Sequence, residues 1–220
     1  MAQIAEDLLL LLLDNASGNP ALERDRCERV LAGAILLDLA FTCRVRPAVP
    51  GEPIEPGRLV ALAGNGPLDP IVEPAFRLLE QRPLRPSGAV SKLRKNAQEH
   101  ISLHLERMGQ LRHIPLSAKR FSDVAAWPLI NRERVAHARV ALLSALFDRR
   151  PPTPSTAAIV SLLHAVDGLG ALLSLNDRGW RWVHARAAEI ASGSWVNEYP
   201  TALPEINLAV TASALRAALA

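Results

Sequence analysis

The chain of 220 residues carries 25 basic and 22 acidic side chains, which gives a formal net charge of +3. This charge is too small to require a nucleic-acid partner, although it permits a local basic patch that favours anionic lipid. Apolar residues make up 49% of the chain, charged residues 21% and aromatic residues only 4%. We therefore expect a mostly helical globular protein, with one domain over residues 1–220.

The N-terminal segment, residues 3–13, is predicted to form a buried helix. Six consecutive leucines, Leu8 to Leu13, occupy every side of such a helix, which indicates burial on most sides. Glu6 and Asp7 precede the leucines, and the run is about half as long as the core of an export signal. We therefore expect it to be part of the folded body, with the two carboxylates stabilising the helix N-terminus.

A second helix is expected over residues 22–41, where apolar side chains recur at helical spacing. Asp38 lies in its apolar part, and because a buried unpaired carboxylate is costly we expect it either to sit at the edge of the apolar stripe or to pair with an arginine, such as Arg44 or Arg46. The cysteines, Cys27 and Cys43, are too far apart along this helix to form a disulfide with each other.

Two short strands, residues 44–46 and 58–62, are predicted on either side of a proline-rich loop. Helices are then expected from Pro70, over 88–108 with Gly109 as a left-handed stop, and over 131–147 with Asn131 as N-cap. Further helices are expected after Thr153 or Ser155 as N-cap, with an apolar side reaching Leu173, from Asp177 to Ile190, and from Pro204 onward. Residues 111–130 show no helical period.

Two histidine arrangements are candidates for chemistry. His100 and His104 would lie one turn apart on a helix, a spacing that can bind zinc, but no third ligand accompanies them and the expected role is a polar helix edge. His164 and Asp167 could orient an imidazole for general-base catalysis, but no nucleophile motif accompanies them. We therefore predict no enzyme, no metal and no cofactor.

Membrane contact, if any, is expected from the surface. No uninterrupted apolar stretch reaches the roughly 18 residues that a spanning helix needs. Unpaired cysteines without an export signal are typical of cytoplasmic proteins, so we predict a cytoplasmic protein that is peripheral to the membrane.

The order and spacing of several motifs resemble the Golgi phosphoprotein 3 family. They are the acidic residues and leucine run at Glu6–Asp14, the block from Leu31 to Val45, the helix end at Gly109, the sequence Trp127-Pro128-Leu129, and Pro154–Leu173. The resemblance covers nearly the whole chain. It implies an all-α fold, a helical bundle surrounded by amphipathic helices, with a small protruding β-hairpin at about residues 111–130.

The resemblance also implies a function. Members of this family are non-catalytic peripheral membrane proteins that bind phosphatidylinositol 4-phosphate and protein tails. The basic lipid pocket of the family matches Glu23, Ala32, Lys95 and Gln98 in this sequence, and only Lys95 is basic. Neighbouring cations can supply substitute charge, so the predicted headgroup site comprises Lys92, Arg94, Lys95, Gln98, Arg24 and Arg29.

The hairpin implied by the resemblance combines aromatic rings with positive charge. Lys119, Arg120, Phe121 and Trp127 have the composition of an interfacial membrane anchor or an oligomer contact, and a hairpin packed on its own domain is the alternative. We predict a non-catalytic adaptor that binds anionic lipid headgroups or protein tails, and a homo-oligomer. The alternatives are a structural oligomeric accessory protein without lipid binding and an enzyme that uses His164 and Asp167.

Overall fold

The computed structural model describes residues 3–15, 17–64, 66–116, 124–197 and 202–220. It is mainly helical, as predicted. The α-helices are α1 (Gln3–Leu12), α2 (Arg24–Phe41), α3 (Glu73–Gln81), α4 (Pro86–Arg107), α5 (Glu133–Leu146), α6 (Pro154–Ala165), α7 (Asp177–Ala191) and α8 (Leu203–Leu219). Two 3-10 turns, η1 (Leu169–Ala171) and η2 (Ser194–Asn197), flank α7.

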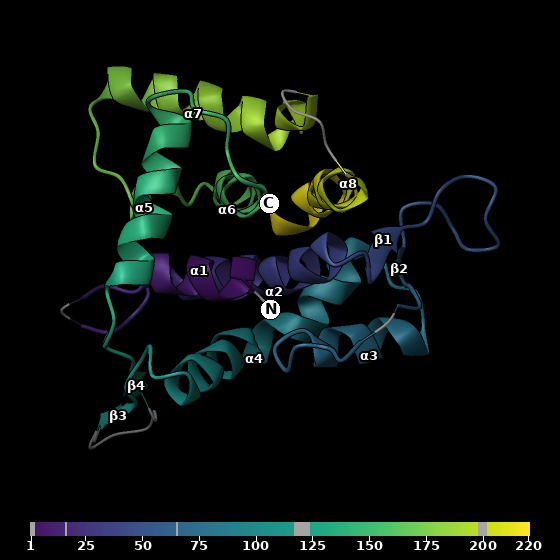
Figure 1. Cartoon of the computed structure of the whole chain (residues 1–220), viewed down its shortest axis with the longest axis horizontal. Coiled ribbons are helices and arrows are strands. Elements are labelled where there is room, and N and C mark those ends of the chain that lie inside the picture. Colours follow the sequence, from purple (N-terminus) through teal and green to yellow (C-terminus); the bar gives the residue numbers. More distant parts are fainter. Residues whose placement is uncertain (1–2, 16, 65, 117–123, 198–201) are drawn as a thin grey trace.

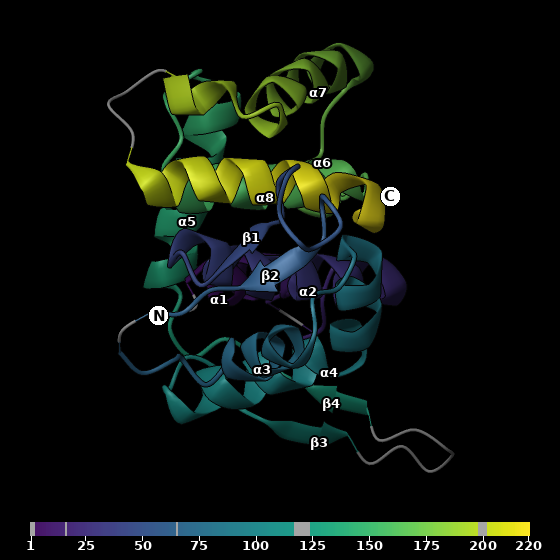
Figure 2. The same cartoon turned by 90° about the vertical axis from the view of Figure 1, so that its right-hand side faces the viewer.

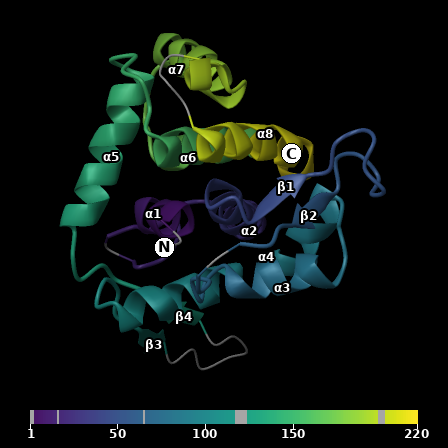
Figure 3. The same cartoon turned by 45° about the vertical axis from the view of Figure 1, so that its right-hand side comes forward.

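The helices form layers around α1 and α2, which lie at the centre (Figure 1). Helices α3 and α4 cover one side of this pair, and α6 and α8 cover the other, with α7 outside them (Figure 2). Helix α5 runs across the layers beside α1 and α6 (Figure 3). The leucine run confirms the predicted burial, since each residue from Leu8 to Leu13 is at most 5% exposed.

Two antiparallel hairpins accompany the helices. Strands β1 (Val45–Pro47) and β2 (Leu59–Ala61) pair with Val45 opposite Ala61, where short strands were predicted. Strands β3 (Ile114–Leu116) and β4 (Val124–Ala126) form the second hairpin, within the predicted 111–130 segment. It projects from the end of α4 (Figure 1). Gly109 ends α4 with φ of 68°, the left-handed stop expected from the sequence.

Several predicted helix boundaries are wrong, and α3, for example, begins at Glu73 rather than at Pro70. Arg132, rather than Asn131, is the N-cap residue of α5, but the Asn131 Oδ1 atom still accepts a hydrogen bond from the Glu133 N–H at 2.9 Å. The helix after Thr153 ends at Ala165 and does not continue toward Leu173, because Asp167 adopts a left-handed φ of 52°. Thr153 caps this helix as predicted, accepting a hydrogen bond from the Thr156 N–H at 3.2 Å.

The base of the second hairpin packs tightly against the loop after α1. Gly18 has φ of 66° and its carbonyl accepts a hydrogen bond from the Trp127 N–H at 2.9 Å. A Cβ atom on Gly18 would lie 2.8 Å from the backbone nitrogens of Trp127 and Pro128. Both the backbone conformation and the close approach therefore require glycine at this position.

Asp38 has a different partner from the arginine predicted. Its two carboxylate oxygens accept hydrogen bonds from the N–H groups of Ile4 and Ala5, at 3.0 and 2.9 Å. These N–H groups belong to the first turn of α1, where no intrahelical acceptor exists, so the buried carboxylate of α2 caps α1. Burial raises the pKa of Asp38 to about 8, although the two backbone hydrogen bonds act in the opposite direction.

A pH dependence of stability follows from the raised pKa of Asp38. The folded state binds the carboxyl proton of Asp38 more tightly than the unfolded state does. The contribution of Asp38 to stability is therefore fully present below about pH 4, and it falls as the pH rises to about 8. We expect the free energy of unfolding of the wild type, minus that of Asp38→Asn, to decrease by at most about 1.4 kcal/mol per pH unit. Urea titrations between pH 5 and 9 measure this difference, and a constant difference would contradict the expectation.

Candidate functional site

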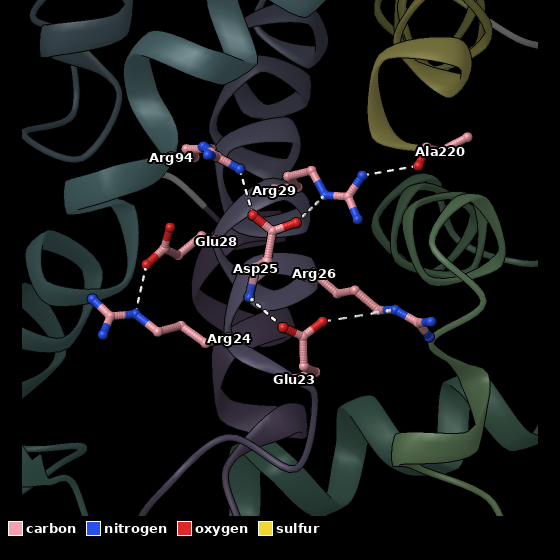
Figure 4. A network of polar contacts seen from close by, with 8 residues as sticks. All are labelled: Glu23, Arg24, Asp25, Arg26, Glu28, Arg29, Arg94 and Ala220. Atoms are coloured by element: carbon pink, nitrogen blue, oxygen red, sulfur yellow. Dashed lines mark hydrogen bonds and ion pairs between the residues drawn. The ribbon is translucent and has the colours of Figure 1, made fainter.

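The predicted headgroup residues lie on two helices that pack along each other. Arg24 and Arg29 are on the first turns of α2, and Lys92, Arg94, Lys95 and Gln98 are on α4. An ion pair joins the two helices, because Arg94 donates a hydrogen bond to the Asp25 carboxylate at 2.5 Å (Figure 4). The structure thus brings the two predicted groups together, and we name these six residues with Asp25 the α2/α4 basic surface.

Acidic residues of α2 occupy several of these cations. Asp25 also pairs with Arg29, whose Nε lies 3.2 Å from the second carboxylate oxygen (Figure 4). The same guanidinium donates a hydrogen bond to the Ala220 carbonyl at 2.9 Å. Arg24 is more exposed and pairs with Glu28 at 2.9 Å. One carboxylate thus serves both Arg29 and Arg94.

The lysines of α4 carry the most accessible positive charge of this surface. Lys92 and Lys95 are exposed, lie one helical turn apart, and make no ion pair with any residue that the structure describes. Gln98 is half-buried one turn further along, and its Oε1 atom lies 4.0 Å from the Cys27 thiol. The ammonium groups are therefore free to meet an anion from solvent.

The remaining two family-matched positions have structural roles. Glu23 is the N-cap residue of α2, and its carboxylate accepts a hydrogen bond from the Asp25 N–H at 3.3 Å. Ala32 is 0% exposed and belongs to the core. Neither Glu23 nor Ala32 has a side-chain hydrogen-bond donor for an anionic headgroup. Any cation that meets such a headgroup must therefore come from the neighbouring basic positions.

The hairpin residues divide into two groups. Lys119, Arg120 and Phe121 lie outside the described residues, so their proposed anchoring and oligomer roles stay predictions. Trp127 is only 5% exposed, and its ring lies 4.6 Å from that of His113. The ring of Trp127 therefore supports the base of the hairpin from inside rather than forming part of an exposed anchor.

The histidine pairs are placed as follows. His104 Nε2 lies 3.5 Å from a carboxylate oxygen of Glu6, and no three metal-ligating side chains come together within the described ranges. The His164 ring lies near that of His184, with ring centroids 6.1 Å apart and the ring planes tilted by 50°, and its Nδ1 atom is buried without a hydrogen-bond partner in the described structure. Burial and the neighbouring His184 lower the pKa of His164. The hydrogen bond that joins it to Asp167 is between backbone atoms, from the Asp167 N–H to the His164 carbonyl at 3.3 Å, and does not orient the imidazole.

A buried ionic cluster was missed by the sequence analysis. Arg134 of α5 contacts Glu6 at 2.5 Å and Asp7 at 2.6 Å, and both acids of α1 are nearly buried. Burial raises the pKa of Asp7, while Arg134 acts in the opposite direction. Glu6 and Asp7 thus join α1 to α5 through Arg134, in addition to their expected role of stabilising the N-terminus of α1. Nothing in the local pattern indicated Arg134, whereas the spacing of Asp25 and Arg29 was an available signal for their ion pair.

The fold and surface define a mainly helical protein with an exposed basic face and, among the described residues, no helix long and apolar enough to cross a membrane. The family model described as Golgi phosphoprotein 3 (GPP34) matches residues 4–203, and the chain belongs to that family. The resemblance noted in the sequence is confirmed. Comparison with curated proteins found no match. Family membership suggests a non-catalytic adaptor or lipid-binding protein.

Proposed function

We propose that the protein is a non-catalytic peripheral adaptor whose α2/α4 basic surface binds anionic phospholipid headgroups. The observation that carries the proposal is the pair of exposed lysines, Lys92 and Lys95, on the helix whose Arg94 pairs with Asp25 of α2. Each basic residue near an anionic membrane surface contributes about 1 kcal/mol to binding, so a few uncompensated charges give weak, reversible association.

The two guanidinium groups that share the Asp25 carboxylate bear on which anionic lipid is bound. Arg29 and Arg94 already pair with Asp25, so a phosphate must compete with a carboxylate for their donors. We therefore propose recognition of negative charge in general, with at most a small preference for a phosphoinositide. Vesicles that contain phosphatidylserine or phosphatidylinositol 4-phosphate, matched in total charge, distinguish the two cases.

Co-sedimentation with vesicles tests the proposal. We expect Lys92→Gln/Lys95→Gln to weaken binding to phosphatidylserine vesicles by about thirtyfold, because two charges near the surface are lost. Binding of the wild type should also weaken as salt is raised, since the contacts are exposed.

Helix α7 offers a matched control for this experiment. Arg178 and Arg181 are exposed with the same spacing of three residues, so Arg178→Gln/Arg181→Gln removes the same charge elsewhere. This control should bind as the wild type does. Equal losses in both double variants would show a non-specific charge effect, and failure of the wild type to bind at low salt would exclude the lipid role and leave binding of protein tails as the adaptor activity to test.

A further inference from the structure

A second site lies away from the α2/α4 basic surface. A cavity of about 470 Å³, open to solvent on one side, is lined by residues of α1, of α5 and of the first two turns of α6. These three helices come together where α5 crosses the layers (Figure 3). The volume falls within the range of small-molecule sites in proteins, roughly 300–1,000 Å³.

The cavity has an apolar part, formed by side chains of all three helices. Leu11, Leu142 and Ile159 line it, and the small side chains of Ala138 and Ala141 leave its volume free on the α5 side. Because Leu142 and Ile159 are at most 3% exposed, a ligand that reaches them is withdrawn from water. This part favours a short hydrocarbon chain.

The polar side of the cavity carries an excess of negative charge. Asp7, Glu133 and Arg134 line it, and the Arg134 guanidinium is already shared between Asp7 and Glu6. One arginine therefore faces two carboxylates within the ion-paired cluster, and Glu133 also lines the cavity. The nearby histidines, His137 in the lining and His104 at 3.5 Å from Glu6, add no positive charge while they are neutral. An anionic ligand would be repelled here, whereas a cation would complete the charge balance.

A hydrogen-bond acceptor inside the same cavity also lacks a donor. The Gln110 side chain lines the cavity, and its Oε1 atom is buried with no hydrogen-bond partner among the residues described. The Gln110 backbone is fixed, since its N–H donates to the Leu105 carbonyl and its carbonyl accepts from the Ile130 N–H, both at 2.9 Å. A buried unpaired acceptor is costly, so a ligand N–H group is favoured at this position.

From these observations we propose that the cavity between α1, α5 and α6 binds a small organic ammonium ion, with its charged end toward Asp7 and Gln110 and its hydrocarbon part against Leu142. This site is separate from the α2/α4 basic surface and does not depend on the lipid-binding proposal. The chemistry that recognises the ligand is a primary ammonium group with N–H donors joined to a short apolar chain.

Isothermal titration calorimetry of the full chain tests the site with three probes of equal chain length. Hexylammonium, hexanol and hexanoate share the apolar part and differ in charge. We expect hexylammonium to bind at one site with a dissociation constant of about 1 mM or lower, and the other two to bind at least about tenfold more weakly. Comparable binding of hexanoate would overturn the proposal, as would no saturable binding of hexylammonium up to about 10 mM.

Variants locate the binding in the cavity. Ala141→Phe fills the cavity without changing charge and should abolish hexylammonium binding, whereas Ala136→Phe, exposed on the same helix, should leave it unchanged. Gln110→Leu removes the unpaired acceptor and should weaken binding by about tenfold. Circular dichroism checks the fold of each variant. Binding that persists in folded Ala141→Phe would place the ammonium elsewhere and refute the assignment.

Discussion

Replacement of Arg134 by methionine is expected to lower the free energy of unfolding by about 3–5 kcal/mol, the usual cost of breaking a buried ion pair from one side. The substitution keeps a long apolar side chain, but it leaves the carboxylates of Glu6 and Asp7 without their guanidinium. Both acids are at most 7% exposed, so water from the neighbouring cavity can replace the lost partner only in part. Urea denaturation at pH 7 followed by circular dichroism measures the loss.

Two comparisons separate this charge effect from a general effect of mutating α5. Arg132→Met, at an exposed residue before the same helix, should change stability by less than about 0.5 kcal/mol. Adding Glu6→Gln and Asp7→Asn to Arg134→Met should restore part of the stability, because no buried charge then remains unpaired. If the triple variant is as unstable as the sum of its parts, the ion pair is not the cause.

Leu9→Ala is expected to destabilise the protein by about 2–5 kcal/mol, because it creates a cavity in the central helix. Leu9 is 0% exposed in the core of α1, and neighbouring leucines on every side of this helix are also buried, so no flexible surface group can fill the space. The same urea titration measures the change.

Leu203→Ala is the matched control for the leucine truncation. Leu203 begins α8 and is 68% exposed, so its truncation should cost less than about 0.5 kcal/mol. Equal losses at the two positions would mean that α1 is not packed at the centre of the fold.

Local patterns were sufficient to predict most of the helices and the strands of the first hairpin, whereas the second hairpin was expected from the family resemblance. Apolar spacing located α2 and α5, and the consecutive leucines indicated a central helix because no single stripe could account for them. Thr153 and Gly109 marked their helix ends because capping depends on residues within one turn. These features need no knowledge of what lies across the fold.

Partners distant in sequence could not be predicted in the same way. Asp38 was expected to pair with a nearby arginine, yet its partners are backbone N–H groups 33 and 34 residues earlier, which no side-chain pattern indicates. The contact of Arg134 with Asp7 spans 127 residues, so it depends on where α5 crosses α1. Trp127 was expected to be part of an exposed membrane anchor because basic residues lie near it in the sequence, but the Gly18 loop and His113 cover it.

The candidate site was predicted in outline and differs in detail. Helical spacing was enough to place Lys92 and Lys95 together on an exposed face, as the structure has them. It could not show that Asp25 of α2 pairs with Arg94 of α4, because that ion pair depends on how the two helices dock. The accessible charge is therefore smaller than a count of basic residues suggests.

The cap that Asp38 provides for α1 has a consequence for the order of folding. The first N–H groups of α1 find their acceptors only after α2 has formed as far as its last turns and has docked against α1. An isolated helix of ten residues is marginal in water. During synthesis, α1 therefore cannot become stable until at least the whole of α2 has followed it.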